Sequence, residues 1–124
     1  MTNIPKVRLG LVAVSRDCFP IELSRKRSLR VAAECRKAGL SITRVPTVVE
    51  NEKDALRALE ELRAKKVNAL VVYLGNFGPE TPATLLAQKF DGPVMVAAAA
   101  EESGRDLIDG RGDAYCGLLN NSYN

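Results

Sequence analysis

Apolar residues gather in short runs along the chain, and longer amphipathic stretches separate these runs. The runs at 6–14, 67–74 and 92–100 are nearly continuous in apolar residues. Such runs are typical of strands that are covered on both faces of a sheet. The stretch 41–49 alternates polar and apolar residues only in part and contains Pro46. We therefore predict a strand at the edge of the sheet there, where a proline is tolerated.

The stretch 21–40 has the pattern of a helix with one apolar side. Its predicted apolar stripe comprises Leu29, Ala32, Ala33 and Cys35. Its basic residues are expected to face outward; they are Arg25, Lys26, Arg27, Arg30, Arg36 and Lys37. Gly39 is placed to end this helix, because glycine readily adopts the left-handed conformation found at helix C-termini.

The stretch 50–66 predicts a second helix with a clear start signal. Asn51 can cap its N-terminus, with Asp54 three residues later. Glu61 and Lys65 stand four residues apart, a spacing that favours an ion pair on the solvent face. The predicted buried stripe comprises Ala55, Leu56, Leu59 and Leu62.

Two shorter helices complete the pattern. Thr81 can cap a helix over 82–90, with Pro82 at its first position. Helical periodicity returns at Asp113, which we expect to act as a cap.

Strands and helices thus alternate, which predicts a three-layer α/β fold of the flavodoxin or Rossmann-like kind, with a parallel sheet and right-handed crossovers. We predict the strand order 2-1-3-4, which places the first and third strands side by side. With 124 residues and 46% apolar content, the chain is long enough for one domain, residues 1–124, and too short for two.

Composition narrows the classes of function. A formal net charge of +3 does not give the strongly basic face of a nucleic-acid binder, so we expect no nucleic-acid partner. No apolar run is long enough to span a bilayer and no secretory leader is recognisable, so we expect no membrane contact and a cytoplasmic location. Three cysteines without a CxxC pair argue against a disulfide framework or a thiolate metal site.

The sequence has no histidine, which removes the commonest general base near neutral pH and the commonest transition-metal ligand. Any chemistry done by this chain alone would have to rest on carboxylates, lysine, cysteine or main-chain groups, and we single out no catalytic residue or metal ligand among them. The loop after the first predicted strand also lacks the GxGxxG and GxxxxGK[ST] patterns of nucleotide-binding loops.

Candidate binding residues lie in the loops SRDCFP (15–20) and GNFGPE (75–80), which follow the first and third predicted strands. In the expected strand order these loops flank one crevice at the carboxyl edge of the sheet, where such folds bind ligands. Phe19 and Phe77 would line a pocket, and Arg16, Asp17 and Asn76 would hydrogen-bond a polar ligand. Alternatively, both rings plug the top of the sheet, and Arg16 pairs with Asp17 at the surface.

Three segments together resemble the N-terminal domain of the L-fucose/L-arabinose isomerase superfamily, in its fucose isomerase-like branch. They are LGLVAVSRDCFPIELSRKR, YLGNFGPETPATLLAQKFDGPVMVAAAAEE and DGRGDAYCGLLNNSYN. The resemblance implies a fragment of a longer multidomain, homo-oligomeric ketol isomerase that interconverts aldoses and ketoses. It also implies that a manganese-type divalent metal is held by Glu, Asp and His residues of downstream domains, so that the isolated chain is inactive.

The same resemblance implies a role for the first domain in the substrate pocket, often that of a neighbouring subunit. Arg16 would bind sugar hydroxyls, and Asn76 and Phe77 would form part of the pocket wall. Phe77 stands in the loop where fucose isomerases use a tryptophan, which leaves the identity of the sugar open.

Two other functions remain open at this stage. The segment ENEKDALRALEELRAKKVNALVVY is similar to the helix and strand of periplasmic-binding-protein and repressor lobes, so the chain could be a sugar-binding lobe without catalysis. It could also be a purely structural oligomerisation domain, in which the arginine-rich first helix meets acidic neighbours.

Overall fold

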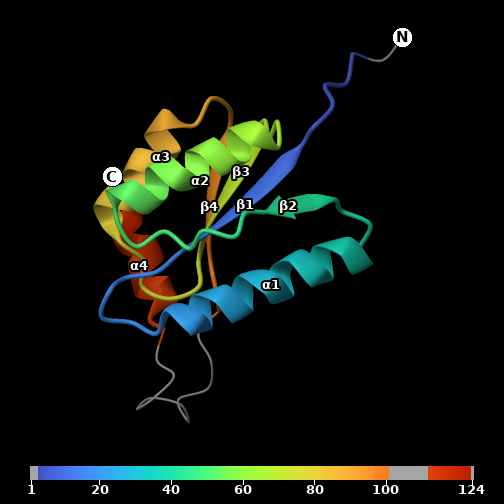
Figure 1. Ribbon diagram of the computed structural model, residues 1–124. Helices are drawn as coiled ribbons and strands as arrows, with labels where there is room; N and C mark the ends of the chain where they lie inside the picture. The colour runs from blue at the N-terminus through green and yellow to red at the C-terminus, as the bar shows by residue number, and fades with distance from the viewer. Residues whose placement is uncertain (1–2, 101–111, 124) are drawn as a thin grey trace.

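The computed structural model describes residues 3–100 and 112–123, in which strands and helices alternate (Figure 1). The elements are β1 (Leu9–Val14), α1 (Ile21–Lys37), β2 (Ile42–Arg44), α2 (Glu52–Ala64), β3 (Ala69–Leu74), α3 (Glu80–Lys89), β4 (Val94–Ala98) and α4 (Ala114–Asn121). All four strands form one parallel sheet in the order β2-β1-β3-β4. This confirms the predicted α/β fold class and strand order.

The register of the two central strands positions the candidate site. β1 and β3 pair along their whole length, from Leu9 opposite Ala69 to Val14 opposite Leu74. Both strands therefore end at the same level, and the loops 15–20 and 75–80 leave the sheet side by side.

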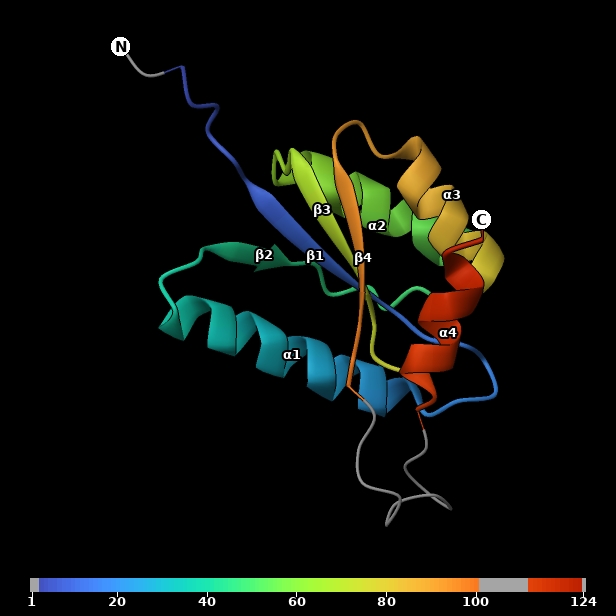
Figure 2. The same ribbon diagram turned by 180° about the vertical axis from the view of Figure 1, so that it is seen from behind.

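Helices cover both faces of the sheet, which confirms the three layers (Figures 1 and 2). α2 and α3 lie on one face, where their buried residues pack against Val12, Val14, Val72 and Leu74. α1 lies on the other face, where a second cluster includes Leu11, Ala32, Ile42, Val71 and Tyr73.

The predicted apolar stripe of α1 was wrong at Leu29, which is 50% exposed. The buried side of α1 is formed by Ser24, Ser28 and Ala32. The Ser24 hydroxyl donates to the Val14 carbonyl at 2.7 Å, and this satisfies its polar group beneath the helix. Small residues at these positions let α1 lie close to the sheet, which an apolar-periodicity argument does not detect.

Helix α2 confirms its predicted N-cap, because Asn51 Oδ1 accepts a hydrogen bond from the Asp54 N–H at 3.0 Å. Leu56 was predicted to be buried and is 48% exposed; Ala58 lies in the buried side instead. Glu61 accepts a hydrogen bond of 2.6 Å from the Thr47 hydroxyl, so its carboxylate ties α2 to the segment after β2 rather than to Lys65.

Three further predictions need correction. β2 keeps its predicted edge position but spans three residues only, and the chain then returns to β1 through a single bridge between Val49 and Val14. α3 begins at Glu80, with Pro79 at the N-cap position, so Thr81 is not its cap. Asp113 does precede α4, but it has φ 47° and its side chain makes no capping hydrogen bond.

β4 was predicted to be buried on both faces, and this prediction was wrong. The strand lies at the open end of the sheet, and Met95 and Val96 are exposed. No helix among residues 3–100 and 112–123 is long and apolar enough to cross a membrane.

Candidate functional site

The loops 15–20 and 75–80 meet at the carboxyl edge of the sheet, and Asn76 joins them. Its side chain is fully buried. Oδ1 accepts hydrogen bonds from the N–H groups of Arg16 at 3.1 Å and Gly78 at 3.2 Å. Nδ2 donates to Ser15 Oγ at 2.8 Å and to the Pro20 carbonyl at 3.3 Å. The amide that was predicted to face a ligand thus uses both of its N–H groups inside the protein.

The two phenylalanines of these loops stack on each other. Their ring centroids lie 5.7 Å apart with an interplanar angle of 22°, and both side chains are half-buried. The Arg16 guanidinium carbon lies 4.9 Å from the Phe77 ring centroid, within the range of a cation–π contact. Phe19, Phe77 and Arg16 therefore form one continuous surface at the carboxyl edge of the sheet, as the strand order predicted.

Arg16 pairs with Glu80, a residue that the sequence did not single out. Arg16 Nη1 lies 3.5 Å from Glu80 Oε1, and the two side chains are 39% and 40% exposed. Glu80 also accepts a hydrogen bond from Asn120 of α4. Glu80 is the first residue of α3, where the helix dipole favours a carboxylate, but this signal was missed because the helix was predicted to begin at Pro82.

Asp17 is exposed and lies near a further acidic residue, Glu50, at the same edge. The pKa of Glu50 is raised above its ordinary value, chiefly by burial and further by the charges of Asp54 and Asp17. Arg16 thus pairs with Glu80 rather than with Asp17, and the Asp17 charge is close enough to Glu50 to contribute to its raised pKa. We call these side chains together the rim: Arg16, Asp17, Phe19, Glu50, Asn76, Phe77 and Glu80.

Glycines allow two helices to clamp the loop 75–80. A Cβ on Gly75 would stand 2.4 Å from the Cα of Ser24 in α1, and a Cβ on Gly117 in α4 would stand 1.7 Å from the Phe77 carbonyl oxygen. Gly78 has φ +75°, a conformation that a β-carbon makes costly. Arg27 of α1, predicted to face outward, instead donates to the Gly75 carbonyl at 2.6 Å.

The charged groups of the rim are accessible from outside, since the side chains of Arg16 and Glu80 are 39% and 40% exposed. Glu80 also lines a cavity of about 240 Å³ on α3, together with Thr81, Thr84, Leu85 and Gln88. The rim can therefore provide one wall of a ligand site.

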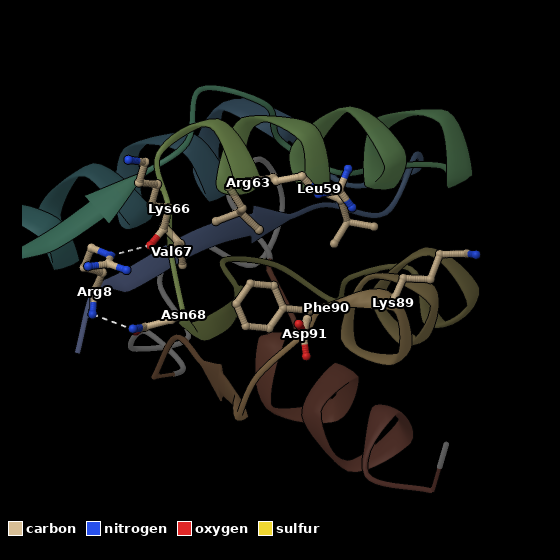
Figure 3. Close-up of a pocket in the computed structure, with 10 residues that line it drawn as sticks. Arg8, Leu59, Arg63, Lys66, Val67, Asn68, Lys89, Phe90 and Asp91 are labelled. Atoms are coloured by element: carbon tan, nitrogen blue, oxygen red, sulfur yellow. Dashed lines mark hydrogen bonds between the residues drawn. The ribbon is translucent and has the colours of Figure 1, made fainter. Parts of the chain in front are cut away.

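One of the cavities, of about 370 Å³, lies at the opposite edge of the sheet around Phe90 (Figure 3). Its basic residues do not converge on a common point, because the side chains of Lys66 and Lys89 extend in opposite directions. Arg63 and Lys89 belong to the last turns of α2 and α3, where cations offset the helix dipole. We therefore assign these charges to helix stability.

No group of three or more His, Cys, Asp or Glu side chains within residues 3–100 and 112–123 is arranged to hold a metal ion. The described residues thus offer no site for the divalent metal, which the resemblance assigns to downstream domains.

Comparison with known proteins adds one match. The sequence model of the family described as Fucose/sulfoquinovose isomerase, N-terminal domain, matches residues 10–124. No curated protein and no solved structure matches the chain significantly.

Proposed function

The chain belongs to the fucose/sulfoquinovose isomerase family, as its N-terminal domain, and we propose that it forms one wall of the sugar pocket in a longer aldose–ketose isomerase. The observation that carries this proposal is the Arg16–Glu80 pair beside the Phe19–Phe77 stack, on the ligand-binding edge of the sheet. We place the manganese-type metal of the reaction in domains beyond this chain, so the isolated chain would not catalyse the reaction.

The rim has the groups that a sugar requires. A sugar presents hydroxyl groups that both donate and accept hydrogen bonds, and patches of C–H groups between them. The Arg16 guanidinium donates, the Glu80 carboxylate accepts, and charge-assisted bonds of this kind are stronger than neutral ones. The half-buried Phe19–Phe77 stack offers apolar surface beside this ion pair.

The charges of the rim favour a neutral sugar over a sulfonated one. Arg16 is already paired with Glu80, and Asp17 and Glu50 add further acidic groups at the same edge. A sulfonate approaching Arg16 would meet these carboxylates, whereas hydroxyl groups can bind both members of the ion pair. We therefore propose a neutral aldose, such as a pentose or a deoxyhexose, as the substrate.

Within this proposal the predicted site residues have different roles. Arg16, Phe77, Phe19 and Asp17 contact the sugar or lie around it, together with Glu80. Asn76 is a positioning residue, because its amide fixes the main chain of Arg16 and of the loop that carries Phe77. The partners of the domain would be the sugar, the downstream domains and further copies of the same polypeptide.

The test uses the full-length gene product with added Mn²⁺ and a panel of pentoses, deoxyhexoses and sulfoquinovose. Arg16→Ala should lower kcat/KM for the preferred sugar by roughly 10- to 100-fold, the usual effect of losing a hydrogen bond to a charged group. Arg57→Ala, an exposed arginine on α2, is the matched control and should leave the rate unchanged.

Unchanged kinetics in Arg16→Ala would remove the rim from the active site. A preference for sulfoquinovose would overturn the charge argument while leaving the isomerase proposal standing. Tight sugar binding without metal and without conversion would instead support the sugar-binding-lobe alternative.

A further inference from the structure

Strand β4 has the sequence of an interior strand but the position of an edge strand. Its residues VMVAA are apolar on both faces, yet Met95 is 58% and Val96 40% exposed. Strands of purely parallel sheets are normally buried on both faces. Natural edge strands are usually protected by charged residues, prolines or bulges, and the five residues of β4 include no charge and no proline.

The main chain of β4 has a second row of hydrogen-bonding groups directed away from β3. The Pro93 carbonyl accepts from the Leu70 N–H, and the Ala99 N–H donates to the Leu74 carbonyl, both at 2.9 Å. Because the direction of main-chain groups alternates along a strand, Met95 and Ala97 also face β3. The N–H and C=O groups of Val94, Val96 and Ala98 therefore point away from β3, to the side where residues 3–100 and 112–123 contribute no strand.

Apolar surface is left uncovered on both faces of this edge. On the α2–α3 face, a cavity of about 380 Å³ is lined by Ala83 and Ala87 of α3, Val96 of β4 and Asn121 of α4, among others. On the α1 face, Met95 is 58% exposed. A strand added beside β4 would direct alternate side chains to the two faces and so would cover Val96 on one face and Met95 on the other.

Helix α4 lies where the connection to such a strand would run. Its first residue, Ala114, packs in the cluster on the α1 face, and from there the helix runs back along β4 to lie beside α3 (Figures 1 and 2). The connections from β2 to β3 and from β3 to β4 place α2 and α3 on the same face of the sheet. A right-handed crossover from β4 to a next strand beyond it requires its helix there as well.

We propose that a fifth parallel strand, supplied by the polypeptide that follows residue 124, pairs with Val94, Val96 and Ala98 and makes β4 an interior strand. The proposal rests on the proposed function only in that the chain continues into further domains. It does not require the sugar, the metal or the rim. The competing occupant of this edge is β4 of a second copy, which a two-fold axis would pair with the first in an antiparallel direction.

The test is amide hydrogen exchange, resolved to single residues by fragmentation mass spectrometry, on the full-length gene product and on the 124-residue chain. In the full-length protein the Val96 and Ala98 amides should exchange at least roughly 100-fold more slowly than in the 124-residue chain, because the added strand protects them. Ala97, which already bonds β3, should change much less. No sugar is present, so failure here is distinct from failure of the isomerase assay.

Val96→Lys provides a second readout, since a charge on the edge should block the added strand. It should lower the Tm of the full-length protein more than that of the 124-residue chain. Leu56→Lys, at a similarly exposed leucine on α2, is the control and should lower neither Tm substantially. If the 124-residue chain does not fold, the proposal is tested on the full-length protein alone, by the exchange rates of Val96 and Ala98 and by the Tm values of Val96→Lys and Leu56→Lys.

Fast exchange of Val96 and Ala98 in the full-length protein would overturn the proposal, as would a gene product that ends at residue 124. Protection that is already present in the 124-residue chain and grows with its concentration would show that a second copy occupies the edge, and would overturn it too.

Discussion

Replacing Asn76 by alanine tests whether one buried amide holds the two rim loops together. The change removes an acceptor from the N–H groups of Arg16 and Gly78, and a donor from Ser15 and Pro20. A buried polar group left without a partner costs about 1–3 kcal/mol. With two main-chain N–H groups affected, and that of Arg16 only part-buried, we expect a loss of about 3 kcal/mol. For a chain of this size that corresponds to a fall in Tm of about 12 °C.

The assay is thermal and urea unfolding followed by circular dichroism, with Asn68→Ala as the matched control. Asn68 also bridges two segments, accepting from the Arg8 N–H at 2.7 Å and donating to the Lys6 carbonyl at 2.9 Å, but both bonds are exposed. Water can replace exposed partners, so this variant should lose only about 1 kcal/mol. Equal losses of unfolding free energy in the two variants would refute the claim that burial makes the hydrogen bonds of Asn76 more stabilising than those of Asn68.

Two further outcomes follow from the structure. Gly117→Ala should destabilise the protein by at least about 2 kcal/mol, because the new methyl group overlaps the Phe77 carbonyl, although the same change in an open helix stabilises by about 1 kcal/mol. Urea unfolding measures this change, with Cys116→Ala at the adjacent exposed position as the control. A Gly117→Ala variant that is more stable than wild type would contradict the close packing. Burial and the Asp54 charge raise the pKa of Glu50 in the folded protein, so its ionisation opposes folding as the pH rises through that pKa. Glu50→Gln should therefore have a higher Tm than wild type at pH 7, and the difference should vanish as the pH is lowered below 4.5; a difference independent of pH would contradict this assignment.

The order and type of the elements were accessible from the sequence because apolar periodicity directly reflects burial. The predictions failed where burial is not achieved by apolar residues. The sheet-facing side of α1 is made of Ser24 and Ser28, whose hydroxyls bond to main-chain carbonyls. The buried side of the helix is therefore not the predicted stripe that included Leu29. The prediction for β4 was wrong in the opposite sense. Its residues are apolar on both faces, which predicts burial on both, but the described residues cover the strand only in part.

The place of the candidate site was predictable, while the roles of its residues were not. Strand order alone brings the loops after β1 and β3 together, and this is why the Phe19–Phe77 contact could be foreseen. A sequence does not show which of several polar residues turns inward. Asn76 does so because four hydrogen-bonding groups surround it, whereas Glu80 stays at the surface because α3 begins there and points it at Arg16.

The rim and the open edge of β4 are mechanically connected through α4. Asn120 of α4 binds Glu80, which pairs with Arg16, and Gly117 of the same helix packs on the main chain of Phe77. A fifth strand beside β4 would hold α4 against the sheet, and through these contacts it would fix the direction of the Arg16 guanidinium. Because preorganised groups bind more tightly than mobile ones, the 124-residue chain should bind a sugar more weakly than the full-length protein, even when it retains every rim residue. Weak binding by the 124-residue chain would therefore not contradict the proposed role of Arg16, and this role is to be tested in the full-length gene product.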